Sequence, residues 1–295
     1  MKRNSILKLS SWALLALLNC YFPHLNAQRV EVDVGVILAS DVAKQFKESI
    51  DGTSCLDIDK YAYEGSTRVY AEALLICQAL TLGGIEPIFN FHQFPSHGRA
   101  LIELKKGTTH LMFSTAWLSQ KHDSLYVSEP LMFVGDFEKG IYTLAENKDL
   151  LNVRSLKQLQ GFKAISNNQF LVDWQMLSQL GIDTYSHPNW DLVFKMLEAK
   201  RGDFILAEFS PEPDMNITTA GVKLIPVQNI KINFNDSRHV FVNKSQDNSA
   251  MIFAALQSGL KTLHQQGTIK KAYQSLGFYN EKITGWLSLG SQVKK

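Results

Sequence analysis

The first half of the chain alternates short apolar runs with longer segments that are apolar on one face. Alternating apolar and polar residues over 30–38 predict a strand that enters a core. Segments 88–94 and 110–113 predict two further strands. Helical spacing of apolar residues predicts helices over 67–82 and 99–106. This alternating order of strands and helices predicts a parallel sheet with crossover helices.

A second set of alternating elements follows Pro130, and the chain then becomes helical. We expect the strands of this second set at 141–144, 162–165, 204–207 and 222–227, and its helices at 170–180 and 189–200. An apolar stripe predicts a long helix over 249–263, and a second helix begins at Thr268. We expect residues 279–295 to form a loose tail.

The segment 99–131 carries most of the functional interpretation. Its apolar strand is followed at once by hydroxyl groups, an indole and a cation, from Ser114, Thr115, Trp117 and Lys121. In open α/β sheets, ligands bind outside the carboxyl ends of the strands. We therefore expect this turn to form one wall of a binding cleft, although the same residues could also cap the turn or pack beneath it.

The first 27 residues have the pattern of a signal peptide. Cations precede a short apolar run over 12–18, and Ala27 supplies a small residue for cleavage. The run is shorter than the roughly 20 residues that a membrane span requires. We expect a mature protein that begins at Gln28 and is exported to the periplasm. The alternatives are an uncleaved anchor and a lipid anchor at Cys20.

Charge and motifs exclude several classes of protein. The leader holds three of the 30 Lys and Arg residues and none of the 28 Asp and Glu residues, so its removal changes the formal charge from +2 to −1. No basic stripe indicates a nucleic-acid partner. The sequence has no nucleophile elbow, zinc-protease motif, phosphate loop or Cys-x-x-Cys motif. We expect no enzyme activity, no cofactor and no metal site.

The two cysteines that follow the leader allow two interpretations. Export permits a disulfide between Cys55 and Cys77. Cys77 also lies on the apolar face of a predicted helix, where a buried free thiol packs well. The sequence does not choose between them.

Two segments resemble the periplasmic (extracellular) solute-binding proteins of family 3, the amino-acid-binding type. Segment 259–278, GLKTLHQQGTIKKAYQSLGF, is similar to the C-terminal helical hairpin of that family. Segment 126–130, YVSEP, resembles the short motif, here called the step, that precedes the hinge in that family. The resemblance implies an α/β fold of the two-lobe, type II kind, in which each lobe is a mostly parallel sheet flanked by helices.

The resemblance also implies how the chain divides between the lobes. Lobe 1 is expected to comprise 28–133 and 243–295, and lobe 2 to comprise 134–242. Hinge strands are expected near 131–140 and 239–242. Closure of such lobes about a hinge traps a ligand in the cleft between them.

The polar turn departs from the pattern of the family. Members that bind amino acids carry an arginine seven residues before the serine of the step, and this position is Lys121 here. Lysine offers a point charge in place of the planar fork of arginine. The family's threonine is Leu118, and the Asp before its strand is His110. These changes favour a polar or anionic ligand over an ordinary α-amino acid.

Further candidate ligand contacts lie outside this turn. Asn167 and Asn168 separate a predicted strand from a predicted helix, where backbone amides can face an anion or simply cap the helix. Glu208 is similar in position to the acid that binds the ligand amine in the family. Tyr63 lies in the loop before the first long helix, from which the family contacts its ligand.

Together these observations predict a monomeric periplasmic protein that captures a small polar or anionic molecule. Its expected partner is an inner-membrane ABC transporter. One alternative is a ligand sensor that acts on a membrane receptor. The other is a dehydratase-like enzyme on the same scaffold, with Glu208 as its general acid or base.

Overall fold

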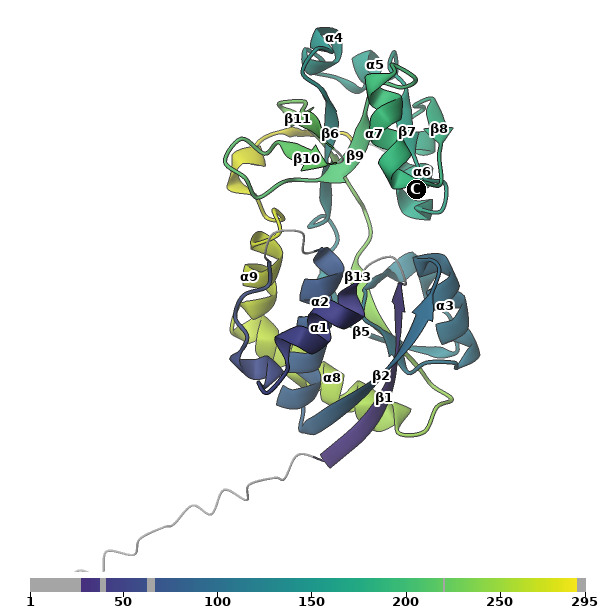
Figure 1. The fold of residues 1–295 in the computed structure, drawn as a ribbon, viewed down its shortest axis with the longest axis vertical. Coiled ribbons are helices and arrows are strands. Elements are labelled where there is room, and N and C mark those ends of the chain that lie inside the picture. The colour runs from purple at the N-terminus through teal and green to yellow at the C-terminus, as the bar shows by residue number, and fades with distance from the viewer. Residues whose placement is uncertain (1–27, 38–40, 63–66, 220, 291–295) are drawn as a thin grey trace, which may run out of the picture.

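The computed structural model describes residues 28–37, 41–62, 67–219 and 221–290. Figure 1 shows two α/β bodies joined by a narrow neck, which we call lobe 1 (lower) and lobe 2 (upper). The predicted signal peptide and Tyr63 lie outside the described residues. Within the described ranges, no helix has the length and apolar character needed to cross a membrane.

Lobe 1 is built on a mixed sheet in the order β2-β1-β3-β13-β4, with β5 paired to β13. The central strand β1 runs parallel to β2 and β3, as the sequence predicts, whereas β13 is antiparallel to β3, β4 and β5. These strands are β1 (Gln28–Ile37), β2 (Ile85–Phe94), β3 (Leu111–Met112), β4 (Ala116–Trp117), β5 (Leu125–Met132) and β13 (Arg238–Asn243).

Helices cover the sheet of lobe 1, and the most extensive packing between two of them is that of α2 against α8. They are α1 (Val42–Ser49), α2 (Arg68–Leu82), α3 (His97–Lys106), α8 (Ser249–Gln265) and α9 (Thr268–Gln274). Most of α2 is fully buried, because it is apolar nearly all round. A Cβ at Gly259 would lie 1.8 Å from the Ala79 carbonyl oxygen, so only glycine lets α8 approach this closely.

The structure contains a disulfide between Cys55 and Cys77. It ties the short turn Cys55–Asp57 to α2. The Gln78 side chain, next in the helix, donates to the carbonyls of Cys55 and Ile58 at 2.9 and 2.8 Å. The disulfide interpretation therefore replaces that of a free thiol packed on an apolar face.

Lobe 2 has a sheet in the order β10-β11-β6-β12-β14, with β9 paired to β6, and a separate parallel pair, β7 and β8. The strands are β6 (Glu138–Leu144), β7 (Ala164–Ser166), β8 (Thr184–Ser186), β9 (Ile205–Glu208), β10 (Ile217–Thr219), β11 (Val222–Pro226), β12 (Ile230–Asn233) and β14 (Leu287–Ser288). The helices are α4 (Lys148–Leu151), α5 (Leu156–Leu159), α6 (Leu171–Gln179) and α7 (Trp190–Glu198).

The expectation of a mostly parallel sheet is wrong for lobe 2. Strand β6 is antiparallel to β9, β11 and β12. The strands from β9 to β12 follow one another without an intervening helix, so they form short antiparallel connections in place of βαβ crossovers. Strands β10 and β12, which complete this antiparallel pattern, were not predicted from the sequence.

Three segments connect the two sheets. Residues 133–137 lead from β5 to β6, and residues 234–237 lead from β12 to β13. The expected second crossing at 239–242 lies inside β13, in the sheet of lobe 1. The third connection is C-terminal, because β14 pairs with β12 after α9 has packed in lobe 1.

The expected loose tail is therefore wrong as far as residue 290. Ile283 and Leu289 are buried there, and the Trp286 ring meets Phe209 edge to face at 5.7 Å. The Tyr279 hydroxyl donates to Asp136 in the first connection at 2.8 Å. The apolar residues are too widely spaced to show a helical or strand period, but each finds a partner on lobe 2.

Candidate functional site

A buried carboxylate, that of Glu72 on α2, lies at the centre of a polar cluster at the edge of lobe 1. Its Oε1 accepts hydrogen bonds from Arg68 Nη1 at 2.6 Å, Thr115 Oγ1 at 2.7 Å and Tyr273 Oη at 2.9 Å. Its Oε2 accepts from the Thr115 backbone N–H at 2.9 Å. Both oxygens are thus fully engaged, as a carboxylate without solvent contact requires.

A second guanidinium, that of Arg238 on β13, lies behind Thr115. Its Nε donates to Thr115 Oγ1 at 2.7 Å and its Nη2 donates to the Thr115 carbonyl at 2.6 Å. The guanidinium carbon lies 4.6 Å from the centre of the Trp117 ring and 5.2 Å from that of Phe137. Stacking on aromatic faces is a favourable setting for a buried arginine.

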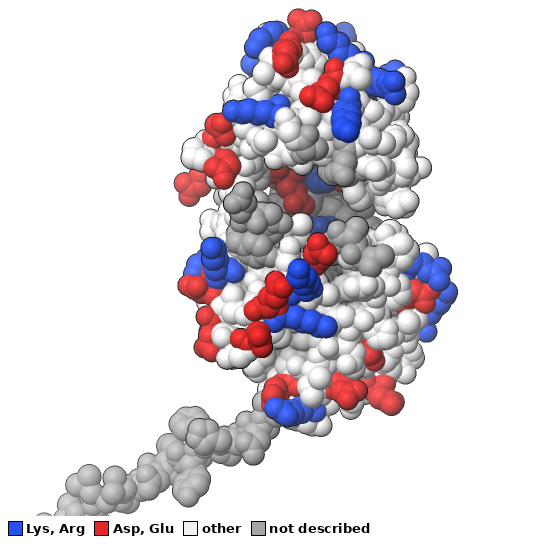
Figure 2. Space-filling model, in the orientation of Figure 1, with Lys and Arg blue, Asp and Glu red and all other residues white. Residues whose placement is uncertain are grey.

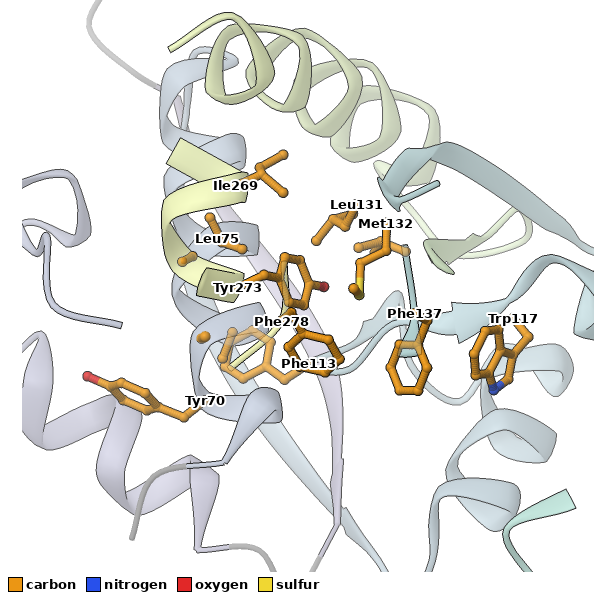
Figure 3. Close-up of a cluster of buried hydrophobic side chains, with 14 of the residues drawn as sticks. Tyr70, Leu75, Phe113, Trp117, Leu131, Met132, Phe137, Ile269, Tyr273 and Phe278 are labelled. Carbon is orange, nitrogen blue, oxygen red and sulfur yellow. The ribbon is translucent and has the colours of Figure 1, made fainter. Parts of the chain in front are cut away.

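Aromatic rings close one side of this cluster. Trp117 meets Phe137 edge to face at 4.9 Å and stacks on Phe234 at 5.6 Å. Figure 3 shows Trp117 and Phe137 side by side, with Tyr273 and Phe278 further along the same apolar cluster. Because Phe137 and Phe234 belong to two of the three connections, this ring cluster lies where the chain passes between the lobes.

One ion pair joins the cluster to lobe 2. Arg68 Nε donates to Glu208 Oε1, at the end of β9, at 3.1 Å. Figure 2 shows the molecule hollowed between its two lobes, with acidic and basic side chains inside the hollow. The Glu208 side chain is about one-third exposed, and its register partner on β6 is Lys139. Lys139 in turn pairs with Asp173 on α6.

The environment fixes the charges of the cluster. Burial alone would raise the pKa of Glu72, but Arg68, Arg238 and the Thr115 hydrogen bonds outweigh it and lower that pKa to about 2. Burial opposes the charge of Arg68, yet Glu72 and Glu208 raise its pKa overall. Burial and then repulsion from Arg68 lower the pKa of Arg238 to about 10. All three groups are charged at neutral pH.

Two further titratable groups border the cluster and remain neutral. Burial, followed by the negative charge of Glu72, raises the pKa of Tyr273 well above its usual value, so its hydroxyl stays a donor. Burial and the Arg238 charge lower the pKa of His97 to about 4. The His97 ring lies 3.3 Å from the Thr115 carbonyl through Nε2.

The structure brings three of the predicted site residues together at the seam. Thr115 bridges Glu72 and Arg238, Trp117 forms the aromatic wall, and Glu208 approaches from lobe 2. Ser114 is buried beside Thr115. The Trp117 ring already contacts Arg238, Phe137 and Phe234, so it acts first as the support of the guanidinium.

The remaining predicted residues are not brought to this cluster. Lys121 is exposed after the short turn Leu118–Gln120, and guanidiniums from other elements supply the cations of the site. Asn167 uses its side chain locally: Oδ1 accepts from Gln169 N at 2.9 Å and Nδ2 donates to the Pro188 carbonyl at 3.3 Å. Asn168 is exposed, and its backbone N–H donates to Ser186.

Sequence reasoning missed four members of the cluster, namely Arg68, Glu72, Arg238 and Tyr273. A signal for the first two was present, because Arg68 and Glu72 are the two charged residues of a mostly apolar helix and lie one turn apart. Arg238 directly precedes the buried run 239–242. Among the described residues, no group of His, Cys, Asp and Glu could hold a metal ion.

The two lobes, their hinge connections and the cluster at the seam define the class of fold. No protein-family model matches the sequence, and no curated protein matches it either. Solved structures do match. The chain has the two-lobe, type II fold of periplasmic binding proteins, as the resemblance predicts.

One matching structure is the probable amino-acid ABC transporter extracellular-binding protein ytmK from Bacillus subtilis, at 14% identity and a TM-score of 0.54, covering 85% of this chain and 99% of that one. Another is the periplasmic VFT2 domain of BvgS from Bordetella pertussis, at 12% identity, a TM-score of 0.52 and coverages of 83% and 92%. A third is the GluR0 ligand-binding core from Nostoc punctiforme in complex with L-glutamate, at 14% identity, a TM-score of 0.48 and coverages of 84% and 98%.

Proposed function

We propose that this chain is a periplasmic solute-binding protein that captures a small polar or anionic solute between its lobes for a membrane transporter. The observation that carries the proposal is the charged cluster at the seam, where Arg68 of lobe 1 meets Glu208 of lobe 2. Buried charges are costly unless they are paired, so a fold seldom places them at a seam without a use.

Capture works through the hinge. A ligand favours the closed form only through contacts that it makes there and not in the open form. Arg68 supplies donors from lobe 1, held in place by the network of Glu72, Thr115 and Arg238. Glu208 and Lys139 supply charge from lobe 2. For micromolar affinity, the net free energy of binding must reach about −8 kcal/mol after the cost of closing the lobes is included.

We also propose a division of the chain with lobe 1 at 28–133 and from 238 onward, and lobe 2 at 134–237, which moves the expected boundary at 242 back to the start of β13. The strand β14 is added to the sheet of lobe 2. In this proposal the signal peptide of residues 1–27 directs export, and the mature monomer works in the periplasm.

A thermal-shift screen of the purified protein against polar metabolites tests solute capture. A ligand at a hundredfold excess over Kd stabilises the protein by roughly 2.7 kcal/mol. Thr115→Val removes the hydroxyl between Glu72 and Arg238 and is expected to reduce the shift, whereas Thr218→Val, at an exposed position on β10, preserves it. The absence of a shift with every metabolite would contradict solute capture.

The sensor alternative is supported by the similarity in fold to the BvgS periplasmic domain. A deletion strain that loses a signalling response and keeps solute uptake would favour it. The enzyme alternative relied on Glu208 as an acid or base, and this carboxylate is engaged by Arg68. We therefore propose binding without catalysis.

A further inference from the structure

The lobe 1 side of the seam carries one more positive charge than negative. Two guanidiniums, those of Arg68 and Arg238, face one buried carboxylate, that of Glu72. Arg238 is only 4% exposed and the Arg68 side chain is 17% exposed, so solvent compensates little of the surplus. A surplus buried charge requires an anionic partner.

In this structure the partner is Glu208 from lobe 2. Among the described residues of lobe 2 near the hinge, Lys139 pairs with Asp173 and Lys231 pairs with Glu138. Glu208 is more exposed than the groups it neutralises, because 34% of its side chain remains accessible. Its departure therefore breaks fewer protein contacts than the departure of Glu72, which accepts four hydrogen bonds and has no contact with solvent.

Arg68 can accept another oxyanion in the same place. Its Nε donates a hydrogen bond to Glu208, and its Nη1 donates one to Glu72. Within the described residues, its Nη2 donates no hydrogen bond. The planar fork of a guanidinium can bind both oxygens of a carboxylate through two parallel hydrogen bonds. Glu208 uses only one of these two bonds, from Arg68 Nε to its Oε1. Lys139 is the register partner of Glu208 on β6, so a displaced Glu208 stays near a cation that also pairs with Asp173.

We infer that the solute carries a carboxylate and that this carboxylate binds Arg68 by displacing Glu208. Glu208 is thus an internal competitor that occupies the carboxylate position when the cleft is empty. The inference rests on the proposed solute capture. The anion contact is then made by Arg68 on α2 and not by Lys121, the residue predicted from the sequence.

Calorimetric titration with matched acids and amines tests the inference. The panel contains acetate, propionate and succinate, their amino counterparts glycine, alanine and aspartate, and the carboxylate-free probes 1,4-diaminobutane and glucose. Glu208→Gln removes the competing charge and is expected to tighten binding of at least one amine-free acid fivefold or more. Glu198→Gln, at an exposed position on α7, makes the same charge change and is expected to leave Kd unchanged.

Arg68→Lys keeps the charge and removes the fork, so we expect it to weaken acid binding at least tenfold. The unfolding midpoint of Arg68→Lys is measured as well, to detect a folding defect. If Arg68→Lys is misfolded, the result for Glu208→Gln alone decides the outcome. If Glu208→Gln weakens acid binding or leaves it unchanged, the inference is overturned. If only carboxylate-free probes bind, the inference is overturned while solute capture stands. If no probe binds either the original protein or Glu208→Gln, the inference is overturned, and the thermal-shift screen decides solute capture separately.

Discussion

Arg68 and Glu208 lie 140 residues apart in the sequence and form an ion pair of 3.1 Å across the seam between the lobes. Arg68 begins α2 in lobe 1, and Glu208 ends β9 in lobe 2. The same guanidinium also holds the buried carboxylate of Glu72. One side chain thus links the internal charge balance of lobe 1 to the position of lobe 2.

The buried carboxylate of Glu72 predicts an acid-sensitive structure. Its pKa in the folded protein is about 2, against a usual value of 4.5, so it favours the folded state when ionised. The corresponding stabilisation, on the order of 3 kcal/mol, is complete above about pH 4.5 and is lost as the pH falls toward 2. Urea unfolding followed between pH 2 and 6 measures it.

The control for this prediction is Glu72→Gln. It leaves two guanidiniums without their carboxylate, so we expect a loss of about 3–5 kcal/mol at pH 7. The pH-dependent part of the stability should largely disappear in this variant. An unchanged acid profile would show that other carboxylates cause it.

The hydroxyl of Thr115 connects the two charges behind the seam. It donates to Glu72 and accepts from Arg238 Nε. Thr115→Val keeps the shape of the side chain but removes one hydrogen bond from Glu72 and one from Arg238. We therefore expect the free energy of unfolding to fall by about 1–3 kcal/mol. Equal unfolding midpoints for Thr115→Val and Thr218→Val would contradict this role.

The disulfide between Cys55 and Cys77 closes a loop with a sequence separation of 22 residues. Cross-linking a loop of this size stabilises by about 3 kcal/mol through the entropy of the unfolded chain. The double variant Cys55→Ser, Cys77→Ser should therefore unfold at a lower temperature by calorimetry. A reductant should lower the melting temperature of the original protein only, and an effect on both proteins would argue against the bond as its target.

The contact between α2 and α8 depends on Gly259. Its Cβ position lies 1.8 Å from the Ala79 carbonyl oxygen, so Gly259→Ala must push the helices apart. We expect a loss of about 1–3 kcal/mol by chemical denaturation. Gly98→Ala, within α3 and with open space at its Cβ position, should instead gain up to about 1 kcal/mol. Equal effects of the two changes would contradict this packing.

Local patterns in the sequence predicted much of the architecture. The apolar faces of α2 and α8 and the alternation in β1 predicted these elements, because such periodicity reflects which side of an element is buried. Thr115 and Trp117 were recognised because polar groups directly follow a buried strand. The two-lobe class followed from resemblance over short segments.

The partners of the charged groups were decided by the tertiary structure alone. Periodicity indicates that a side chain is buried but not what it meets, so Arg68, Arg238 and Glu208 could not be joined in advance. The antiparallel pairings of β6 and the return of β14 to lobe 2 were missed for the same reason. Hydrogen bonds between strands and ion pairs between lobes form between distant residues, and their geometry exists only once the chain has packed.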